Sequence, residues 1–135
     1  MRIMCLDIGD KRIGIAITDP LGIIASPYGV LKVTNQGDAL KEILKIVTSL
    51  SIGLVLLGVP YNQDGNSTEQ SNKNVFYADN LRGKIKIDFC DERFSTIEAY
   101  GSLQEMGISY KKGKKSIDKI SASLILQRYL EREKV

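Results

Sequence analysis

Histidine is absent from this chain, and cysteine and proline are scarce, with two and three copies. The absence of histidine excludes Ser-His-Asp and Cys-His catalysis and any zinc site with histidine ligands. Cys5 and Cys90 each lie in an apolar, strand-like run and form no Cys-x-x-Cys motif, so we expect buried, reduced thiols rather than a redox or zinc site. Any chemistry must therefore use carboxylates, lysines, tyrosines, hydroxyl groups or a bound metal ion.

Long apolar runs are absent as well. No segment approaches the roughly 20 apolar residues of a membrane helix, and Asp7 breaks the first apolar run, which does not fit a signal peptide. With 43% hydrophobic and 26% charged residues in a length of 135, the sequence predicts one globular domain spanning residues 1–135. We therefore expect a cytoplasmic protein with no membrane partner, present as a monomer or a weak homodimer.

The net charge of +3 is unevenly distributed. Residues 110–135 hold eight Lys or Arg against three Asp or Glu, a balance of +5, whereas residues 1–109 have a balance of −2. A carboxylate-rich body with a basic C-terminal stretch fits a protein that binds a polyanion. It fits a solvated helix with a lysine-rich loop equally well, so charge alone does not decide between the two.

The chain is predicted to begin with three strands in an antiparallel meander. Apolar runs at 3–6 and 15–18 flank a turn at Gly9-Asp10, which suits a hairpin. A third strand is expected over Ile23–Val33. Pro27 favours an edge position for this strand, because proline cannot donate to a ladder of hydrogen bonds.

Helices and strands then alternate along the rest of the chain. We expect a helix over about 37–50, capped by Thr34 or Asn35, and then a strand over 54–57. A second helix runs from a capping box at Ser67 and Gln70 to Leu81, and a strand follows over 84–90. The last elements are a helix from Ser95 or Thr96 to about Met106, a basic loop at 110–115 and a helix over 117–133. The residues expected to face inward are Val75, Phe76 and Leu81 on one helix and Ile117, Ile120, Leu124 and Ile125 on the last. This order predicts an α/β fold with a five-stranded mixed sheet, in which the antiparallel meander is joined by two parallel strands and flanked by helices.

Carboxylates at three positions are candidates for chemistry. Asp7 ends a run that otherwise reads as buried, Asp91 and Glu92 follow the last strand, and Asp118 lies near the start of the last helix. Open sheets of this kind form their sites beyond the carboxyl ends of parallel strands, where these acids would meet. Acids from separate elements repel one another unless a cation neutralises them, and clusters of oxygen ligands suit Mg²⁺ or Mn²⁺.

Each of these features has a structural alternative. Asp118 could complement a helix dipole, and Asp91, Glu92 and Arg93 could form a solvated turn with a local ion pair. The lysines of the basic loop could be solvated or could bind phosphate; they are Lys111, Lys112, Lys114 and Lys115. Asp7 is the hardest of these residues to explain structurally, because the run before it reads as buried and a buried carboxylate is costly unless it is paired or binds a cation.

Four motifs, in order and covering nearly the whole chain, resemble those of the YqgF/RuvX family. They are Asp7-x-Gly9-x-Lys11-Arg12-Ile13-Gly14-x-Ala16-x-Thr18-Asp19, then Gly58-Val59-Pro60 with Asp64-Gly65, then Asp91-Glu92-Arg93-Phe94-Ser95-Thr96, and finally Lys114-Lys115-Ser116-Ile117-Asp118 followed by Ala122, Ile125 and Leu126. Members of this family are RuvC-like nucleases with an RNase H-like fold, described as Holliday junction resolvases or pre-16S rRNA nucleases. Thr18 in place of the usual Ser and Lys119 after Asp118 depart from the family pattern.

The resemblance implies a role for particular residues. Asp7, Glu92 and Asp118 would be the catalytic acids that bind Mg²⁺ or Mn²⁺, with Asp91 as a further candidate ligand. Lys11, Arg12 and Arg93 would lie beside the scissile phosphate, and the four lysines of the basic loop would hold the nucleic acid.

The function that follows is metal-dependent hydrolysis of phosphodiester bonds in structured nucleic acid. The favoured substrate is structured RNA at the 5′ end of the 16S rRNA precursor, and branched DNA with Holliday junctions is the alternative. A nucleotide-binding module of the actin-like type and a non-catalytic nucleic-acid-binding protein of ribosome assembly are the other hypotheses. The nucleotide-binding module would need two such domains around the nucleotide. The non-catalytic protein is disfavoured because carboxylates weaken phosphate binding unless a metal is present.

Overall fold

The computed structural model describes the backbone of residues 1–59, 69–91 and 110–133, and the side chains of 1–58, 74–90 and 120–132. The elements in chain order are β1 (Arg2–Ile8), β2 (Arg12–Thr18), β3 (Ala25–Lys32), α1 (Gln36–Ser49), β4 (Ile52–Val59), α2 (Glu69–Leu81), β5 (Lys86–Asp91) and α4 (Tyr110–Glu133). The predicted helix over residues 96–106 and the capping box at Ser67 fall outside the described residues.

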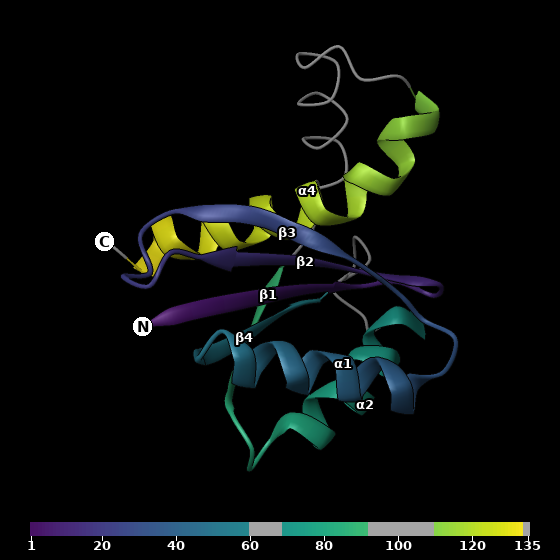
Figure 1. The fold of residues 1–135 in the computed structure, drawn as a ribbon, viewed down its shortest axis with the longest axis horizontal. Coiled ribbons are helices and arrows are strands. Elements are labelled where there is room, and N and C mark those ends of the chain that lie inside the picture. The colour runs from purple at the N-terminus through teal and green to yellow at the C-terminus, as the bar shows by residue number, and fades with distance from the viewer. Residues whose placement is uncertain (60–68, 92–109, 134–135) are drawn as a thin grey trace.

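The strands form one sheet in the order β3-β2-β1-β4-β5 (Figure 1). The β1–β2 and β2–β3 pairs are antiparallel, and the β1–β4 and β4–β5 pairs are parallel. The predicted meander and the two added parallel strands are confirmed. Strand β3 lies at an edge of the sheet, as Pro27 indicated.

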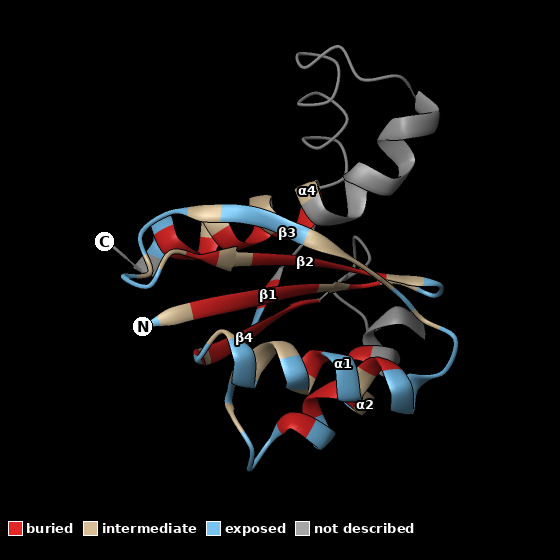
Figure 2. Ribbon diagram, viewed as in Figure 1, coloured by how far each residue is buried: buried red, intermediate tan, exposed pale blue. Residues whose placement is uncertain are grey.

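Two helical layers cover the two faces of the sheet (Figure 1). On one face, Leu6, Ile13 and Leu57 pack with residues of α1 and α2 such as Ile43 and Tyr77. On the other face, side chains of β1, β2, β4 and β5 pack against α4; this set comprises Ile3, Cys5, Ala16, Leu54, Leu56 and Cys90 against Ala122, Ile125, Leu126, Tyr129 and Leu130. Figure 2 shows the buried residues concentrated in the central strands and on the helix surfaces that meet them.

Both cysteines are buried in the layer beneath α4, as the sequence predicted. Helix α1 begins at a cap of the predicted kind, because the Asn35 side chain accepts a hydrogen bond from the backbone N–H of Asp38 at 2.8 Å. This bond satisfies one of the donors that a helix leaves open at its first turn.

The inward face of α2 agrees with the prediction only in part. Leu81 is buried and Phe76 is partly buried against the core, as predicted, but Val75 is 53% exposed. Among the described residues of α2, Asn74, Tyr77, Ala78 and Leu81 are buried, at the spacing of one helical face. The prediction was wrong for Val75 because Asn74, a polar residue, occupies an inward position.

Helix α4 also differs from the prediction in extent. It begins at Tyr110, so the expected basic loop over 110–115 is the first part of the helix. Ile125 is buried, as expected, but Ile120 and Leu124 are only half-buried, because the stripe that faces the sheet runs through Ala122, Ile125 and Tyr129.

Candidate active site at the carboxyl ends of the parallel strands

Asp7 lies near the carboxyl end of β1, the central strand of the sheet, and is half-buried. Along β1, Ile3 and Cys5 face α4, and residues in a strand alternate between faces, so Asp7 falls on the α4 face. Its partner on β2 is Gly14, which has no side chain. The neighbouring strand therefore places no side-chain atoms directly opposite the carboxylate.

The turn after Asp7 is tight. The backbone N–H of Gly9 donates to the carbonyl oxygen of Arg12 at 2.9 Å. A Cβ at position 9 would lie 2.9 Å from that same oxygen, so the turn requires glycine. A hollow of about 260 Å³ is lined, among the described residues, by Gly9, Asp10, Lys11 and Arg12.

Arg12 shares the face of Asp7. Arg12, Gly14 and Ala16 alternate along β2, and Ala16 packs beneath α4. Because Gly14 is opposite Asp7, Arg12 is its diagonal neighbour, at a typical separation of about 7–8 Å. A guanidinium at that distance can lie beside a phosphate held at the carboxylate.

Asp91 is the last residue of β5, and the parallel pairing brings the carboxyl ends of β1, β4 and β5 to the same edge of the sheet. Since β4 lies between them, the ends of β1 and β5 are two strand spacings apart, roughly 10 Å. Cys90 is on the α4 face, and positions alternate between faces along a strand, so position 91 belongs to the face of the sheet opposite to that of Asp7. Glu92 and Arg93 lie outside the described residues.

Asp118 lies in the body of α4, eight residues after Tyr110, rather than in its first turn. The dipole-complementing alternative for Asp118 is therefore wrong, because that effect is limited to the terminal turn. Position 118 precedes Ala122, Ile125 and Tyr129 by four, seven and eleven residues, a spacing that continues their helical row towards the N-terminus of α4.

Asn74 is a residue at this edge that the sequence analysis missed. It is 2% exposed, and its Nδ2 donates to the carbonyl oxygen of Gly58, near the carboxyl end of β4, at 2.7 Å. The other end of the amide, Oδ1, is buried and has no hydrogen-bond partner among the residues that the structure describes. Asn74 thus ties α2 to the strand that separates β1 from β5.

The second half of the first motif stabilises the opposite end of the sheet. Thr18 is buried, and its hydroxyl accepts from the N–H of Ile3 at 2.9 Å. The Asp19 carboxylate accepts from the N–H groups of Ile23 and Ile24 at 2.7 and 2.8 Å. These backbone hydrogen bonds, that of Ile24 first, lower the pKa of Asp19 below its ordinary value. Thr18 and Asp19 are therefore structural residues.

Among the side chains that the structure describes, no group of three Asp, Glu, His or Cys residues lies close enough to hold a metal ion. Asp7 is the described member of the predicted set, and a half-buried carboxylate at the edge of a sheet is an oxygen donor of the kind that hard divalent ions prefer. The residue present fits such an ion, and the other predicted ligands lie outside the described side chains.

The sheet order and the strand directions define an RNase H-like fold. Residues 1–132 match the family model RuvX, described as Holliday junction resolvase, and the chain belongs to this family. Membership makes the chain a hydrolytic nuclease that acts on nucleic acid, and it implies dependence on a divalent metal ion in general.

Relatives of known name span the same length. A Clostridium novyi protein named "Putative pre-16S rRNA nuclease" is 35% identical, with 97% of this chain and 98% of the relative aligned. Proteins of the same name from Clostridium botulinum and Clostridium tetani are 38% identical over 97% of this chain and cover 97% and 96% of the relative.

Two solved structures share the fold at low sequence identity. The Fowlpox virus resolvase in complex with Holliday junction DNA has a TM-score of 0.62 at 16% identity, covering 98% of this chain and 99% of that one. The Thermus thermophilus RuvC in complex with a Holliday junction also has a TM-score of 0.62, at 11% identity, covering 100% and 97%. In the described part of this chain, no helix is long and apolar enough to cross a membrane.

Proposed function

We propose that this nuclease trims the 5′ end of the 16S rRNA precursor, with Asp7, Glu92 and Asp118 as its catalytic acids. The observation that carries the proposal is Asp7: a half-buried carboxylate on the central strand, opposite a glycine and diagonal to Arg12 on the same face. The names of the clostridial relatives favour an RNA precursor as the substrate. Because Cys5 and Cys90 are buried thiols, the protein suits the reducing cytoplasm.

Of the two acids that the third motif offers, we favour Glu92 over Asp91 as the partner of Asp7. Cys90 packs beneath α4, so position 91, next to it along β5, belongs to the other face of the sheet. Asp118 is the third acid of the proposal, at a position of α4 that continues the helical row of Ala122 and Ile125. The ion that these acids hold is Mg²⁺ or Mn²⁺, since the set contains only carboxylate oxygens.

A pair of such ions would supply the chemistry when bound, one activating a water and the other stabilising the departing 3′ oxygen. The side chains of this protein then have separate tasks. Asp7 would hold the metal ion, while Lys11 and Arg12 and, from the third motif, Arg93 would neutralise the charge of the phosphate. The lysines at the start of α4 hold the substrate backbone; these are Lys111, Lys112, Lys114 and Lys115.

Resolution of branched DNA is the second candidate, because the matching family model is described as a Holliday junction resolvase. The two candidates share the same chemistry and differ in the shape of the substrate. The proposed contacts do not distinguish an RNA substrate from a DNA substrate, because they are made to phosphate groups and not to bases.

The test is a cleavage assay on a 16S precursor RNA and a four-way DNA junction, with and without Mg²⁺, followed by analysis of the product ends. We expect 5′-phosphate and 3′-hydroxyl ends on the RNA. Asp7→Asn should abolish cleavage, keep the circular dichroism spectrum and bind RNA equally or more tightly, since a negative charge is lost. Cleavage that survives EDTA, or 2′,3′-cyclic phosphate ends, would exclude the mechanism. Binding of either substrate without cleavage would favour the non-catalytic alternative.

A further inference from the structure

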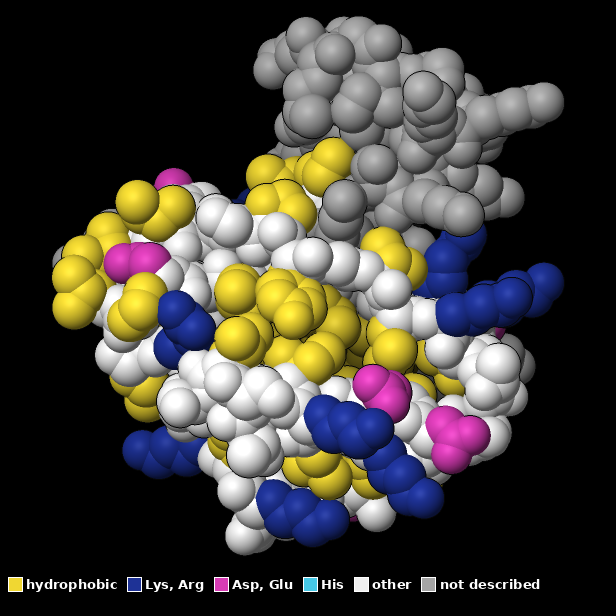
Figure 3. Space-filling model, in the orientation of Figure 1, with side chains coloured by type: hydrophobic (Ala, Val, Ile, Leu, Met, Phe, Trp, Pro, Cys, Tyr) yellow, Lys and Arg dark blue, Asp and Glu magenta, His cyan; other side chains and the backbone are white. Residues whose placement is uncertain are grey.

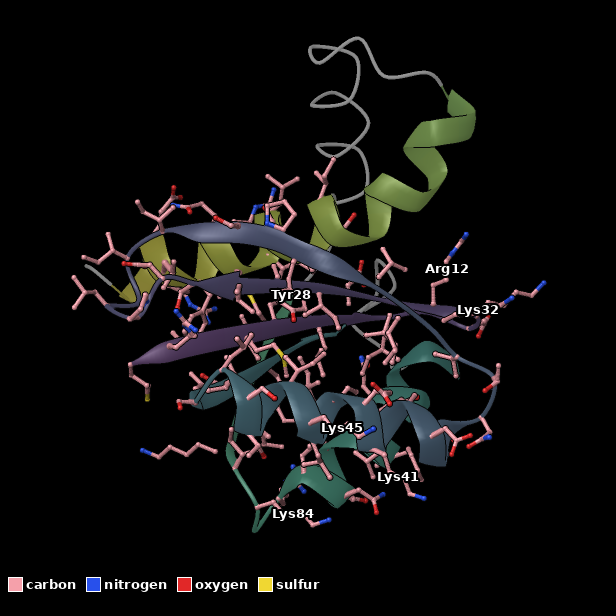
Figure 4. The ribbon with its side chains drawn as sticks, viewed as in Figure 1. Arg12, Tyr28, Lys32, Lys41, Lys45 and Lys84 are labelled. Atoms are coloured by element: carbon pink, nitrogen blue, oxygen red, sulfur yellow. The ribbon has the colours of Figure 1, made fainter. Side chains whose placement is uncertain are left out.

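A third cation lies beside Lys11 and Arg12, on a strand that the motifs do not include. Lys32 is the last residue of β3 and pairs directly with Arg12 of β2. The backbone N–H of Val33 donates to the carbonyl oxygen of Lys11 at 2.8 Å, which joins the end of β3 to the hairpin. Figure 4 shows Arg12 and Lys32 extending from the same end of the sheet.

Lys32 shares a face with the candidate site. Asp7 pairs with Gly14, and Gly14 pairs with Val30, so these three positions lie on one face of the sheet. Arg12 and Lys32, each two residues along its strand, pair with each other on that same face. The irregularity in the β2–β3 pairing lies further along, at Ile15 and Ala16, and leaves this register intact. All three positions, 7, 12 and 32, therefore fall on the α4 side of the sheet.

The placement of Arg12 opposite Lys32 is unfavourable for folding alone, because like charges directly across two strands repel each other. Lys32 is exposed and, within the described residues, has no ion pair or side-chain hydrogen bond. It is also the only charged residue between Ala25 and Val33. In Figure 3, Lys and Arg side chains project at this end of the molecule.

From this geometry we infer that Lys11, Arg12 and Lys32 form one phosphate-binding surface, and that the substrate strand leaves the site across β2 towards the edge strand β3. The ligand is the sugar-phosphate backbone of a nucleic acid, which a row of flexible ammonium and guanidinium groups binds without reading sequence. The inference rests on the proposed nuclease function and extends it, since it assigns Lys32 a contact and gives the substrate a direction.

The test is fluorescence anisotropy of a labelled single-stranded RNA and a labelled four-way DNA junction, in EDTA, over a series of salt concentrations. Lys32→Ala should weaken binding of both probes several-fold and make the slope of log K against log salt shallower by about 0.7–0.9, the contribution of one phosphate contact. Lys32→Arg should restore binding, and Lys32→Glu should weaken it more than Lys32→Ala.

Lys84→Ala is the matched control. Lys84 is also exposed, and it precedes β5, so it lies at the amino end of that parallel strand, away from Asp7. Figure 4 shows Lys84 on a different part of the molecule from Lys32. Equal effects of Lys32→Ala and Lys84→Ala, with wild type binding normally, would overturn the Lys32 surface alone. If wild type bound neither probe, the proposed function would fail as well.

Discussion

Gly14 on β2 is the direct cross-strand partner of Asp7 on β1, so the carboxylate of the central strand faces a position that has no side chain. Gly14 is itself buried. The pairing places no side-chain atoms of β2 directly opposite the carboxylate. It gives a physical reason for a glycine in the middle of a strand, where this residue is otherwise unfavourable.

Gly14→Val should abolish or strongly reduce cleavage, because a branched side chain would fill the space opposite Asp7. Adding atoms to a packed position should also lower the free energy of unfolding by about 1–3 kcal/mol. Gly29→Val is the control in the same sheet, since a Cβ at Gly29 would meet nothing within 4 Å. Cleavage rates and urea unfolding of the two variants check the prediction. Normal cleavage by Gly14→Val would show that the space is not used.

Mn²⁺ should bind wild type more tightly than Asp7→Asn in a calorimetric titration. The amide keeps the size of the carboxylate but removes the charge that a divalent ion requires. Asp79→Asn is the control, because Asp79 is an exposed residue of α2 whose partner is Arg82 at 3.3 Å. Equal affinity for Mn²⁺ in wild type and Asp7→Asn would remove Asp7 from the metal site.

Asn74→Ala should lower the free energy of unfolding by about 1–3 kcal/mol, the cost of leaving a buried backbone carbonyl without its partner. The lost bond is the 2.7 Å hydrogen bond to Gly58. Asn80 is the matched control in the same helix, because its Nδ2 donates to the carbonyl oxygen of Phe76 at 2.8 Å on an exposed surface. Asn80→Ala should cost much less, since water can replace that bond. Equal losses in guanidinium unfolding would contradict the role of Asn74.

Much of the fold could be predicted because the patterns are local. The Gly9-Asp10 turn and the alternating runs on either side specify the hairpin, and Pro27 specifies an edge strand. Asp7 stood out because an acid interrupted an apolar run. Asn74 could not be found in this way, because a hydrophobic pattern assigns polar residues to the surface, and only the carbonyl of Gly58, far away in sequence, makes its burial favourable.

The start of α4 was missed for a related reason. Gly113 and the lysines around it have the composition of a loop, yet they belong to α4, whose later residues, such as Ala122, Ile125 and Tyr129, pack against the sheet. A helix that packing holds can extend beyond its packed residues, because propagation costs less than nucleation. The consequence for the site is that Asp118 lies in the body of a helix. The sequence alone did not decide whether Asp118 complements the helix dipole or binds a metal ion.

Replacing Lys111, Lys112, Lys114 and Lys115 with alanine should weaken binding of RNA and DNA alike and flatten its salt dependence. The helix itself should not suffer. Alanine has the highest helix propensity, and positive charges near a helix N-terminus oppose the dipole, so the substitutions should stabilise the first turns of α4. Circular dichroism on the same samples checks this. An unchanged salt slope would mean that the lysines are only solvated.

Asp19→Asn should change how stability depends on pH. The pKa of Asp19 is lowered in the folded protein by hydrogen bonds from Ile24 and Ile23, so the unfolded chain binds more protons between the two pKa values, and stability rises with pH there. The contribution of the ionised group is complete above its ordinary pKa, about 3.9, and is lost as pH falls through the lowered value. Asn keeps the acceptor oxygen but not the charge, so wild type should be more stable than Asp19→Asn at neutral pH, and the difference should shrink in acid. Urea unfolding across this pH range measures the difference.

The control is Asp19→Ala, which removes the acceptor oxygen as well and should remain destabilised at every pH. A difference between wild type and Asp19→Asn that does not change with pH would show that the hydrogen bonds, and not the charge, carry the stabilisation.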